Sequence, residues 1–168
     1  MGLLENKIAI ITGAGRGIGK ATAHQYSQEG ATVIIAEFDE QSGQETANSI
    51  GGHFFKADIS SQKNVTSLFK YVKTKFNRLN ILVNNAGILN DSTLKKMESD
   101  QFDSVMNVNL RGTYLCGKAA ANIMIEQKSG VILNAASVVA HNGNFGQTNY
   151  VASKTGVIGM TKVWAREL

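Results

Sequence analysis

Short apolar runs alternate with longer helical patterns along this chain, and this alternation limits the possible folds more than any other feature. The runs expected to be strands are residues 7–12, 32–37, 54–57, 81–84 and 131–135. The first run is nearly continuous and rich in β-branched residues, which is typical of a strand buried on both faces, and the run at 54–57 is weaker. The helical patterns end near residue 29 and then cover residues 40–50, 61–76, about 99–127 and about 149 to the end, with Ser99 expected to cap the fourth helix.

This order of elements predicts an α/β fold, an open parallel sheet with helices on both faces. No repeat, linker or change in composition divides the chain, so residues 1–168 are expected to form a single domain. The longest irregular stretches, 87–98 and 140–148, follow the carboxyl ends of strands. Ligands bind at that edge in open α/β sheets, so we expect the functional site there.

The composition narrows the class of partner and the compartment. The formal net charge is +4, but basic and acidic residues are interleaved, so we expect no nucleic-acid partner. The single cysteine, Cys116, excludes an intrachain disulfide and is typical of a reducing, cytoplasmic compartment. The N-terminus carries no long apolar segment, so neither a signal peptide nor a membrane anchor is expected. The three histidines share no metal-ligand spacing, so no metal site is expected.

A glycine-rich loop follows the first apolar run and precedes a helix. It reads Thr-Gly-x-x-x-Gly-x-Gly over residues 12–19. A loop in this place directs backbone N–H groups and a helix N-terminus toward an anion, and its glycines let the backbone come close. The P-loop is excluded by spacing, because Ala14 and Ala21 stand where that motif needs glycine and serine or threonine. The loop therefore predicts another kind of phosphate cradle.

Glu37 ends the second expected strand and sets the expected cofactor preference. A carboxylate there accepts hydrogen bonds from both hydroxyls of an adenosine ribose and repels a 2′-phosphate, which favours NAD over NADP. Arg16 argues mildly for NADP, because its guanidinium could reach a 2′-phosphate. Asp58 ends the third strand, where it either contacts adenine or serves as a turn residue.

Two groups of asparagines lie at places where an amide can serve either the fold or a site. Asn84-Asn85-Ala86-Gly87 ends the fourth strand, where amides either form a turn or brace the sheet beneath a cofactor. Asn109 lies on an apolar face of the long helix, and a buried amide must be paired. It bonds the backbone, holds a water that leads protons away, or does both.

Tyr150 and Lys154 lie four residues apart at the start of the last helix, and Ser137 follows the fifth strand. Residues four apart share one face of a helix. A fixed ammonium beside a phenol favours the phenolate, and a helix N-terminus acts in the same direction. Tyr150 is therefore a candidate general acid or base, and Ser137 a candidate donor to the oxygen that exchanges the proton.

Together these motifs resemble the short-chain dehydrogenase/reductase family over essentially the whole chain. The matching segments are TGAGRGIG, ADIS, NNAG, VNLRGTY, the serine at 137 and YVASK. The resemblance implies a Rossmann-like fold with strand order 3-2-1-4-5. It implies a catalytic tetrad of Asn109, Ser137, Tyr150 and Lys154. It also implies cofactor contacts from Gly13, Arg16, Gly17, Ile18, Gly19, Glu37, Asp58, Ile59, Asn85, Ala86, Gly87, Tyr150 and Lys154.

Within the family, the chain resembles the 3-oxoacyl-(acyl-carrier-protein) reductases most. This implies an NAD(P)-dependent interconversion of a ketone and a secondary alcohol in fatty acid biosynthesis, with acyl carrier protein as a possible partner. Two alternatives stay open: an NAD-dependent dehydrogenase of a sugar, polyol or steroid alcohol, and a non-catalytic dinucleotide-binding or interaction module. A homodimer or homotetramer is expected, with close helix packing through Gly112, Cys116, Ala119 and Ala120 or, alternatively, with that face packed only on the sheet.

The chain departs from the family after Leu168, at the end of the helix that carries Tyr150. Relatives continue with a sixth strand, a substrate lid and a seventh strand. Without those strands, we expect the fifth strand to be an exposed edge. This departure is the reason that the non-catalytic alternative stays open.

Overall fold

The computed structural model describes residues 2–168 and contains one parallel sheet of five strands in the order β3-β2-β1-β4-β5. The predicted strand order is therefore confirmed. The pairings are parallel throughout, for example Ile10 with Ile34 and with Leu82. The strands are β1 (Ile8–Thr12), β2 (Thr32–Glu37), β3 (His53–Lys56), β4 (Ile81–Asn84) and β5 (Val131–Asn134).

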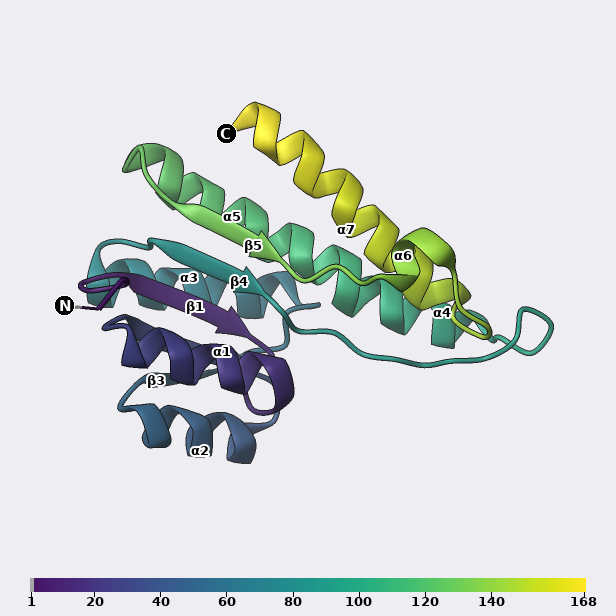
Figure 1. Cartoon of the computed structure of the whole chain (residues 1–168), viewed down its shortest axis with the longest axis horizontal. Coiled ribbons are helices and arrows are strands. Elements are labelled where there is room, and N and C mark those ends of the chain that lie inside the picture. The colour runs from purple at the N-terminus through teal and green to yellow at the C-terminus, as the bar shows by residue number, and fades with distance from the viewer. Residues whose placement is uncertain (1) are drawn as a thin grey trace.

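Helices cover both faces of the sheet, as predicted (Figure 1). Alternate residues of β1 point to opposite faces, so Ile11 packs in the core beneath α1 and α2 while Ile10 packs in the core beneath α3 and α5. The helices are α1 (Gly17–Gln28), α2 (Glu40–Ile50), α3 (Gln62–Phe76), α4 (Ser99–Val105), α5 (Thr113–Glu126), the short α6 (Val139–Asn142) and α7 (Thr148–Glu167).

The long helix predicted over 99–127 is present but differs in two ways. A π-helical turn, η1 (Met106–Gly112), joins α4 to α5. Ser99 is the first helical residue and not the cap, so that prediction is wrong. Glu98 is the capping residue, and its N–H donates to Oε1 of Gln101 at 3.0 Å. The glutamine three positions into the helix makes this contact, which is one half of a capping box.

Most of the small-residue face expected to pair with a second copy packs inside the fold, and Ala119 is partly buried. Cys116 and Ala120 are fully buried in the core beneath α3 and α5. A Cβ at Gly112 would lie 2.7 Å from Cδ1 of Ile59, so this glycine lets η1 sit against the segment after β3. Gly112, Cys116 and Ala120 therefore pack on the sheet side, and pairing with a second copy stays a prediction.

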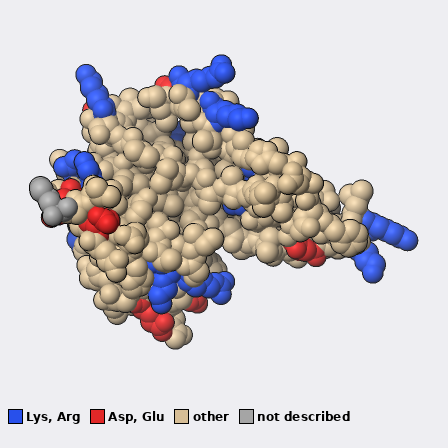
Figure 2. Space-filling model, viewed as in Figure 1, with Lys and Arg blue, Asp and Glu red and all other residues tan. Residues whose placement is uncertain are grey.

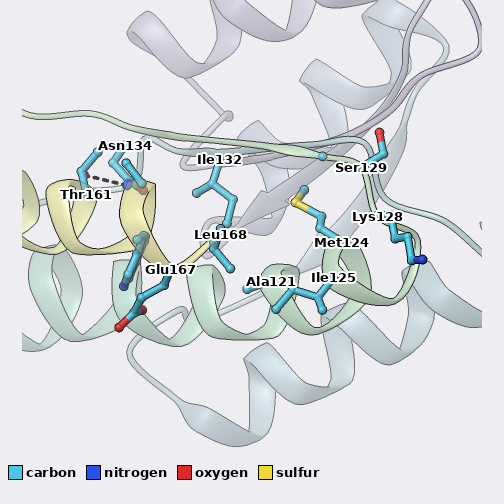
Figure 3. Close-up of a pocket in the computed structure, with 13 residues that line it drawn as sticks. Ala121, Met124, Ile125, Lys128, Ser129, Ile132, Asn134, Thr161, Glu167 and Leu168 are labelled. Atoms are coloured by element: carbon cyan, nitrogen blue, oxygen red, sulfur yellow. Dashed lines mark hydrogen bonds between the residues drawn. The ribbon is translucent and has the colours of Figure 1, made fainter.

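β5 is an edge strand, and it lies beside an open groove between β5, α5 and the end of α7 (Figure 3). Val131 is 52% exposed and Leu133 45% exposed, which confirms the exposed edge expected from the sequence. Ile132, Met124 and Leu168 line the groove, and the Asn134 amide donates to the Thr161 hydroxyl at 2.9 Å at one end of it.

Charged side chains do not gather into one patch on the face seen in Figure 2, where basic and acidic groups are spread around the rim. Within residues 2–168, no helix has both the length and the hydropathy that a membrane span requires.

Candidate active site

The glycine loop is fastened to the end of β4 by the Thr12 hydroxyl and the Asn85 amide. The Thr12 hydroxyl accepts the N–H of Asn85 at 3.0 Å and that of Ala86 at 3.1 Å. The Asn85 side chain donates to the carbonyls of Thr12 and Gly13, both at 3.0 Å. The amide therefore braces the two strand ends at the carboxyl edge of the sheet, which is one of the roles predicted for this run.

Glycine is required at two places in this loop. Gly13 has φ +64°, and a Cβ there would lie 2.7 Å from Cα of Ala86. A Cβ at Gly19 would lie 2.4 Å from Nδ2 of Asn85. A side chain at Gly13 would therefore collide with the Ala86 backbone, and one at Gly19 would displace the Asn85 amide.

α1 begins within the same loop, and N–H groups at its N-terminus are available to bind an anion. Its capping residue, Arg16, makes no side-chain cap bond, and the first turn holds no acidic residue. The first N–H groups of a helix have no partner within the helix, and they carry partial positive charge. Arg16, Gly17 and Ile18 are all exposed beside them. These residues fit the diphosphate of a dinucleotide.

Glu37 lies against this loop with its carboxylate held by three backbone N–H groups. Oε2 accepts from Gly15 at 2.9 Å, and Oε1 accepts from Phe38 at 2.8 Å and Asp39 at 3.2 Å. A carboxylate offers about four acceptor sites, so capacity for a further donor remains. The fixed negative charge is therefore at the place where an adenosine ribose is expected.

Asp58 and Ile59 follow β3 and have clear structural partners. Oδ1 of Asp58 accepts the amide of Ser60 at 2.9 Å and its hydroxyl at 2.7 Å, which is the turn role considered from the sequence. The Ile59 side chain is buried in the core. Adenine contacts from these two residues stay predictions.

Asn109 lies in the π-helical turn, fully buried, and clamps the segment that follows β4. Its Oδ1 accepts from the N–H of Ile88 at 2.8 Å, and its Nδ2 donates to the carbonyl of Ile88 at 3.0 Å. Nδ2 also donates to the Ser153 hydroxyl at 3.3 Å. π-Helical turns are often found at functional sites. The backbone-bonding role is therefore present, and the water-holding role stays a prediction.

Tyr150 and Lys154 share one face of α7, as their spacing predicts. The Lys154 Nζ lies 5.7 Å from the centre of the Tyr150 ring and donates to the carbonyl of Ala135 at 2.6 Å. Lys154 is buried, and this burial lowers its pKa below the ordinary lysine value. Tyr150 is half-buried. Ser137 follows β5 two residues after Ala135 and is also half-buried.

Gly87 is the point where these groups meet. A Cβ on Gly87 would lie 3.3 Å from Oδ1 of Asn109 and 3.7 Å from Nζ of Lys154. The end of β4, the π-helical turn and α7 therefore converge at this glycine. The cooperation of Ser137 with Tyr150 stays a prediction.

Two buried polar residues of α7 contribute to the site although their sequence context does not mark them out. Ser153 bridges Asn109 and the Tyr150 carbonyl, to which its hydroxyl donates at 2.7 Å. Asn149 precedes Tyr150 and bonds three backbone groups. Their signal is weak, because a serine or asparagine near a helix start is also common at caps.

The cysteine and the acidic residues add no further chemistry near this site. Cys116 is buried, and burial raises the pKa of its thiol to about 12. Over residues 2–168 no three side chains of the metal-binding types come together.

A parallel sheet in this order, with a glycine loop and a Tyr–Lys pair at its carboxyl edge, defines a dinucleotide-dependent oxidoreductase of the Rossmann-like class. The profile of the short chain dehydrogenase family matches residues 7–168. The chain belongs to this family of oxidoreductases.

The curated relatives described next are all named 3-oxoacyl-(acyl-carrier-protein) reductase. The chain is 43% identical to the 3-oxoacyl-(acyl-carrier-protein) reductase of Thermotoga maritima, over 98% of this chain and 69% of the relative. It is 40% identical to the enzyme of that name from Synechocystis sp., over 100% of this chain and 70% of the relative. The Staphylococcus aureus reductase is also 40% identical, over 96% of this chain and 68% of the relative.

Proposed function

We propose that the chain reduces a 3-oxoacyl thioester, with NADH as donor and Tyr150 as general acid. The observation that carries the proposal is the buried Lys154 held 5.7 Å from the Tyr150 ring, at the sheet edge where the glycine loop opens. The activity for which these relatives are named supports this substrate class. Acyl carrier protein is the proposed carrier of the acyl group.

The residues of the site suit a carbonyl group that gains negative charge on its oxygen. A bound nicotinamide dinucleotide supplies the hydride. Tyr150 transfers its proton to the carbonyl oxygen, and Ser137 donates a hydrogen bond to the same oxygen. Lys154 holds positive charge beside the phenol and would hold the ribose of the cofactor. Asn109 keeps a proton path open to the site. In the direction of alcohol oxidation, Tyr150 accepts the proton instead.

The cofactor is proposed to lie along the carboxyl edge of the sheet. Its diphosphate is held by the loop of residues 13–19 and the N-terminus of α1. The fixed carboxylate of Glu37 favours a free ribose hydroxyl over a 2′-phosphate, which gives a preference for NAD. The exposed guanidinium of Arg16 is the group that opposes this preference.

The decisive experiment is a substrate panel of 3-oxoacyl thioesters, sugars, polyols and steroid ketones, measured with NADH and NADPH side by side. We expect the highest kcat/KM for a 3-oxoacyl thioester with NADH. Tyr150→Phe should lower kcat by about 100-fold or more and leave the cofactor Kd unchanged. Retention of wild-type turnover in Tyr150→Phe would overturn the mechanism.

The cofactor preference has its own test in Glu37→Gln. This change removes the charge and keeps one of the two acceptor oxygens, which can still accept either from Gly15 or from Phe38 and Asp39. We expect the ratio of kcat/KM for NADPH over NADH to rise by about tenfold. An unchanged ratio would show that Glu37 does not set the preference.

A further inference from the structure

Asn149 is fully buried at the start of α7, next to the proposed general acid Tyr150. Its Oδ1 accepts the N–H of Tyr150 at 2.7 Å. Its Nδ2 donates to two carbonyls from distant parts of the chain, that of Asn90 at 2.9 Å and that of Gln101 at 3.2 Å. One side chain therefore joins α7, α4 and the long segment that follows β4.

The segment after β4 runs away from the sheet as an irregular stretch and returns to α4 (Figure 1). Asn90 and Asp91 within it are exposed. Such a stretch is held in place only by individual hydrogen bonds, so each buried hydrogen bond matters to its position. At the beginning of the segment, the Asn109 side chain hydrogen-bonds the backbone of Ile88. At its centre, the segment hydrogen-bonds the residues just before Tyr150.

Three hydrogen bonds connect the centre of the segment to the residues just before Tyr150. The N–H of Ser92 donates to the carbonyl of Gly146 at 2.8 Å. The side chain of Gln147 donates to Oδ2 of Asp91 at 2.8 Å. Asn149 supplies the third of these bonds and, unlike the other two, its side chain also touches Tyr150 and α4. Asn149 is therefore the residue that links the segment, α4 and the Tyr150 backbone.

Asn149 also completes the helix that carries the chemistry. The first N–H groups of a helix need partners from outside it, and the capping residue Gln147 makes no side-chain cap bond. The Asn149 oxygen takes up the N–H of Tyr150 instead. The backbone at Tyr150 is therefore fixed by the same side chain that fixes Asn90.

We propose that Asn149 is a positioning residue that locks the Tyr150 backbone to the segment 88–98, so that the acid and the adjoining wall of the site keep one geometry. The inference rests on the proposed function for its kinetic consequence, but its structural consequence is independent. Loss of the amide should let both segments move. A misplacement of about 1 Å at a reacting group lowers rates by about 100-fold.

The kinetic test uses Asn149→Ala and Asn149→Asp. Aspartate keeps the acceptor for Tyr150 but loses both donated bonds, so it separates the helix contact from the segment contact. We expect kcat to fall by about tenfold to 100-fold in both variants, with the Kd for NADH within about twofold of wild type. Wild-type kcat in both variants would overturn the proposal.

Two controls separate positioning from a general loss of stability. Asn48→Ala removes an exposed asparagine on α2 and should leave kcat unchanged. Val72→Ala opens the core beneath α3, away from the site, and should lower the midpoint of urea unfolding. If Val72→Ala lowered kcat as much as Asn149→Ala did, positioning would not explain the effect.

Amide hydrogen exchange tests the structural part without any turnover. In Asn149→Ala the amides of Ser92 and Tyr150 should exchange faster together, by about tenfold or more, while those of β1 stay unchanged. Wild-type exchange at both amides would overturn the proposal even if kcat fell. If the wild-type chain reduced no substrate, the proposed function would fail and this exchange result would still decide the role of Asn149.

Discussion

The Lys154 ammonium lies 5.7 Å from the centre of the Tyr150 ring, one helical turn away on α7. A second contact fixes it there, because Nζ also donates to the carbonyl of Ala135 at the end of β5. The Lys154 side chain therefore connects the Tyr150 ring to the edge of the sheet. Burial of that charge is the physical reason that its pKa is lowered.

The first prediction concerns the pH dependence of stability at Lys154. Burial lowers the pKa of Lys154 in the folded state. At a pH between that lowered value and the ordinary lysine pKa of about 10.4, Lys154 binds a proton in the unfolded chain but not in the native chain. The contribution of Lys154 to stability therefore becomes more favourable as pH rises through this window. The free energy of unfolding of wild type should rise relative to that of Lys154→Met as pH approaches about 10.

Urea unfolding of both proteins at a series of pH values measures this difference. Lys70→Met, at an exposed position on α3, shows how much of the change comes from losing a lysine as such. If the difference between wild type and Lys154→Met fell with rising pH, burial of the Lys154 ammonium would not control it.

The second prediction concerns Ser153, which joins Asn109 to the Tyr150 carbonyl. Ser153→Ala leaves one N–H of the buried Asn109 amide without a partner. Such a loss costs about 1–3 kcal/mol of unfolding free energy. Chemical denaturation measures it, and Ser67→Ala is the matched control because its hydroxyl donates to the carbonyl of Lys63 on the exposed face of α3. If Ser153→Ala and Ser67→Ala lowered the free energy of unfolding equally, the bond between Ser153 and Asn109 would not explain the effect of Ser153→Ala.

β1 and β2 followed from sequence because each is a short apolar run rich in β-branched residues, whereas β3 is weaker and the strand order came from the family resemblance. β1 is buried along its whole length, and β2 over its four central residues. The glycine loop and the Tyr–Lys pair were predictable because their spacing is local. The links from Asn149 to the carbonyls of Asn90 and Gln101 were not, because main-chain carbonyls leave no mark in a sequence.

The π-helical turn and the helix cap at Glu98 were missed for a related reason. The apolar pattern of residues 99–127 is helical on both sides of η1, so it reads as one α-helix. Asn109 bonds the backbone of Ile88 from within the turn, and that tertiary contact cannot be read from helical periodicity. Ser99 fits the preference for capping residues, but Gln101 makes the contact that starts the helix one residue earlier.

The third prediction concerns the only cysteine, Cys116, which is buried in the core beneath α3 and α5. Burial raises the pKa of its thiol to about 12, so almost no thiolate exists at a pH of about 8. Iodoacetamide should leave the native protein unmodified at that pH and alkylate it in concentrated urea, as intact mass shows. Rapid modification of the native protein would mean that this core opens.

The fourth prediction compares two glycines that differ only in their surroundings. A Cβ at Gly19 would lie 2.4 Å from both Nδ2 of Asn85 and the carbonyl oxygen of Gly13, whereas a Cβ at Gly159 on α7 would meet nothing within 4 Å. Alanine is a better helix former than glycine by about 1 kcal/mol. Gly159→Ala should therefore raise the free energy of unfolding by up to about that amount and leave dinucleotide affinity unchanged.

Gly19→Ala should do the opposite. The new methyl group must displace the Asn85 amide, whose bonds to Thr12 and Gly13 hold the glycine loop in place. Loss of these bonds should destabilise the fold by about 1–3 kcal/mol and weaken NADH binding by at least about tenfold. Denaturation and fluorescence titration with NADH measure the two effects in parallel. If Gly19→Ala bound NADH as tightly as Gly159→Ala, the cofactor would not depend on the loop geometry that Asn85 maintains.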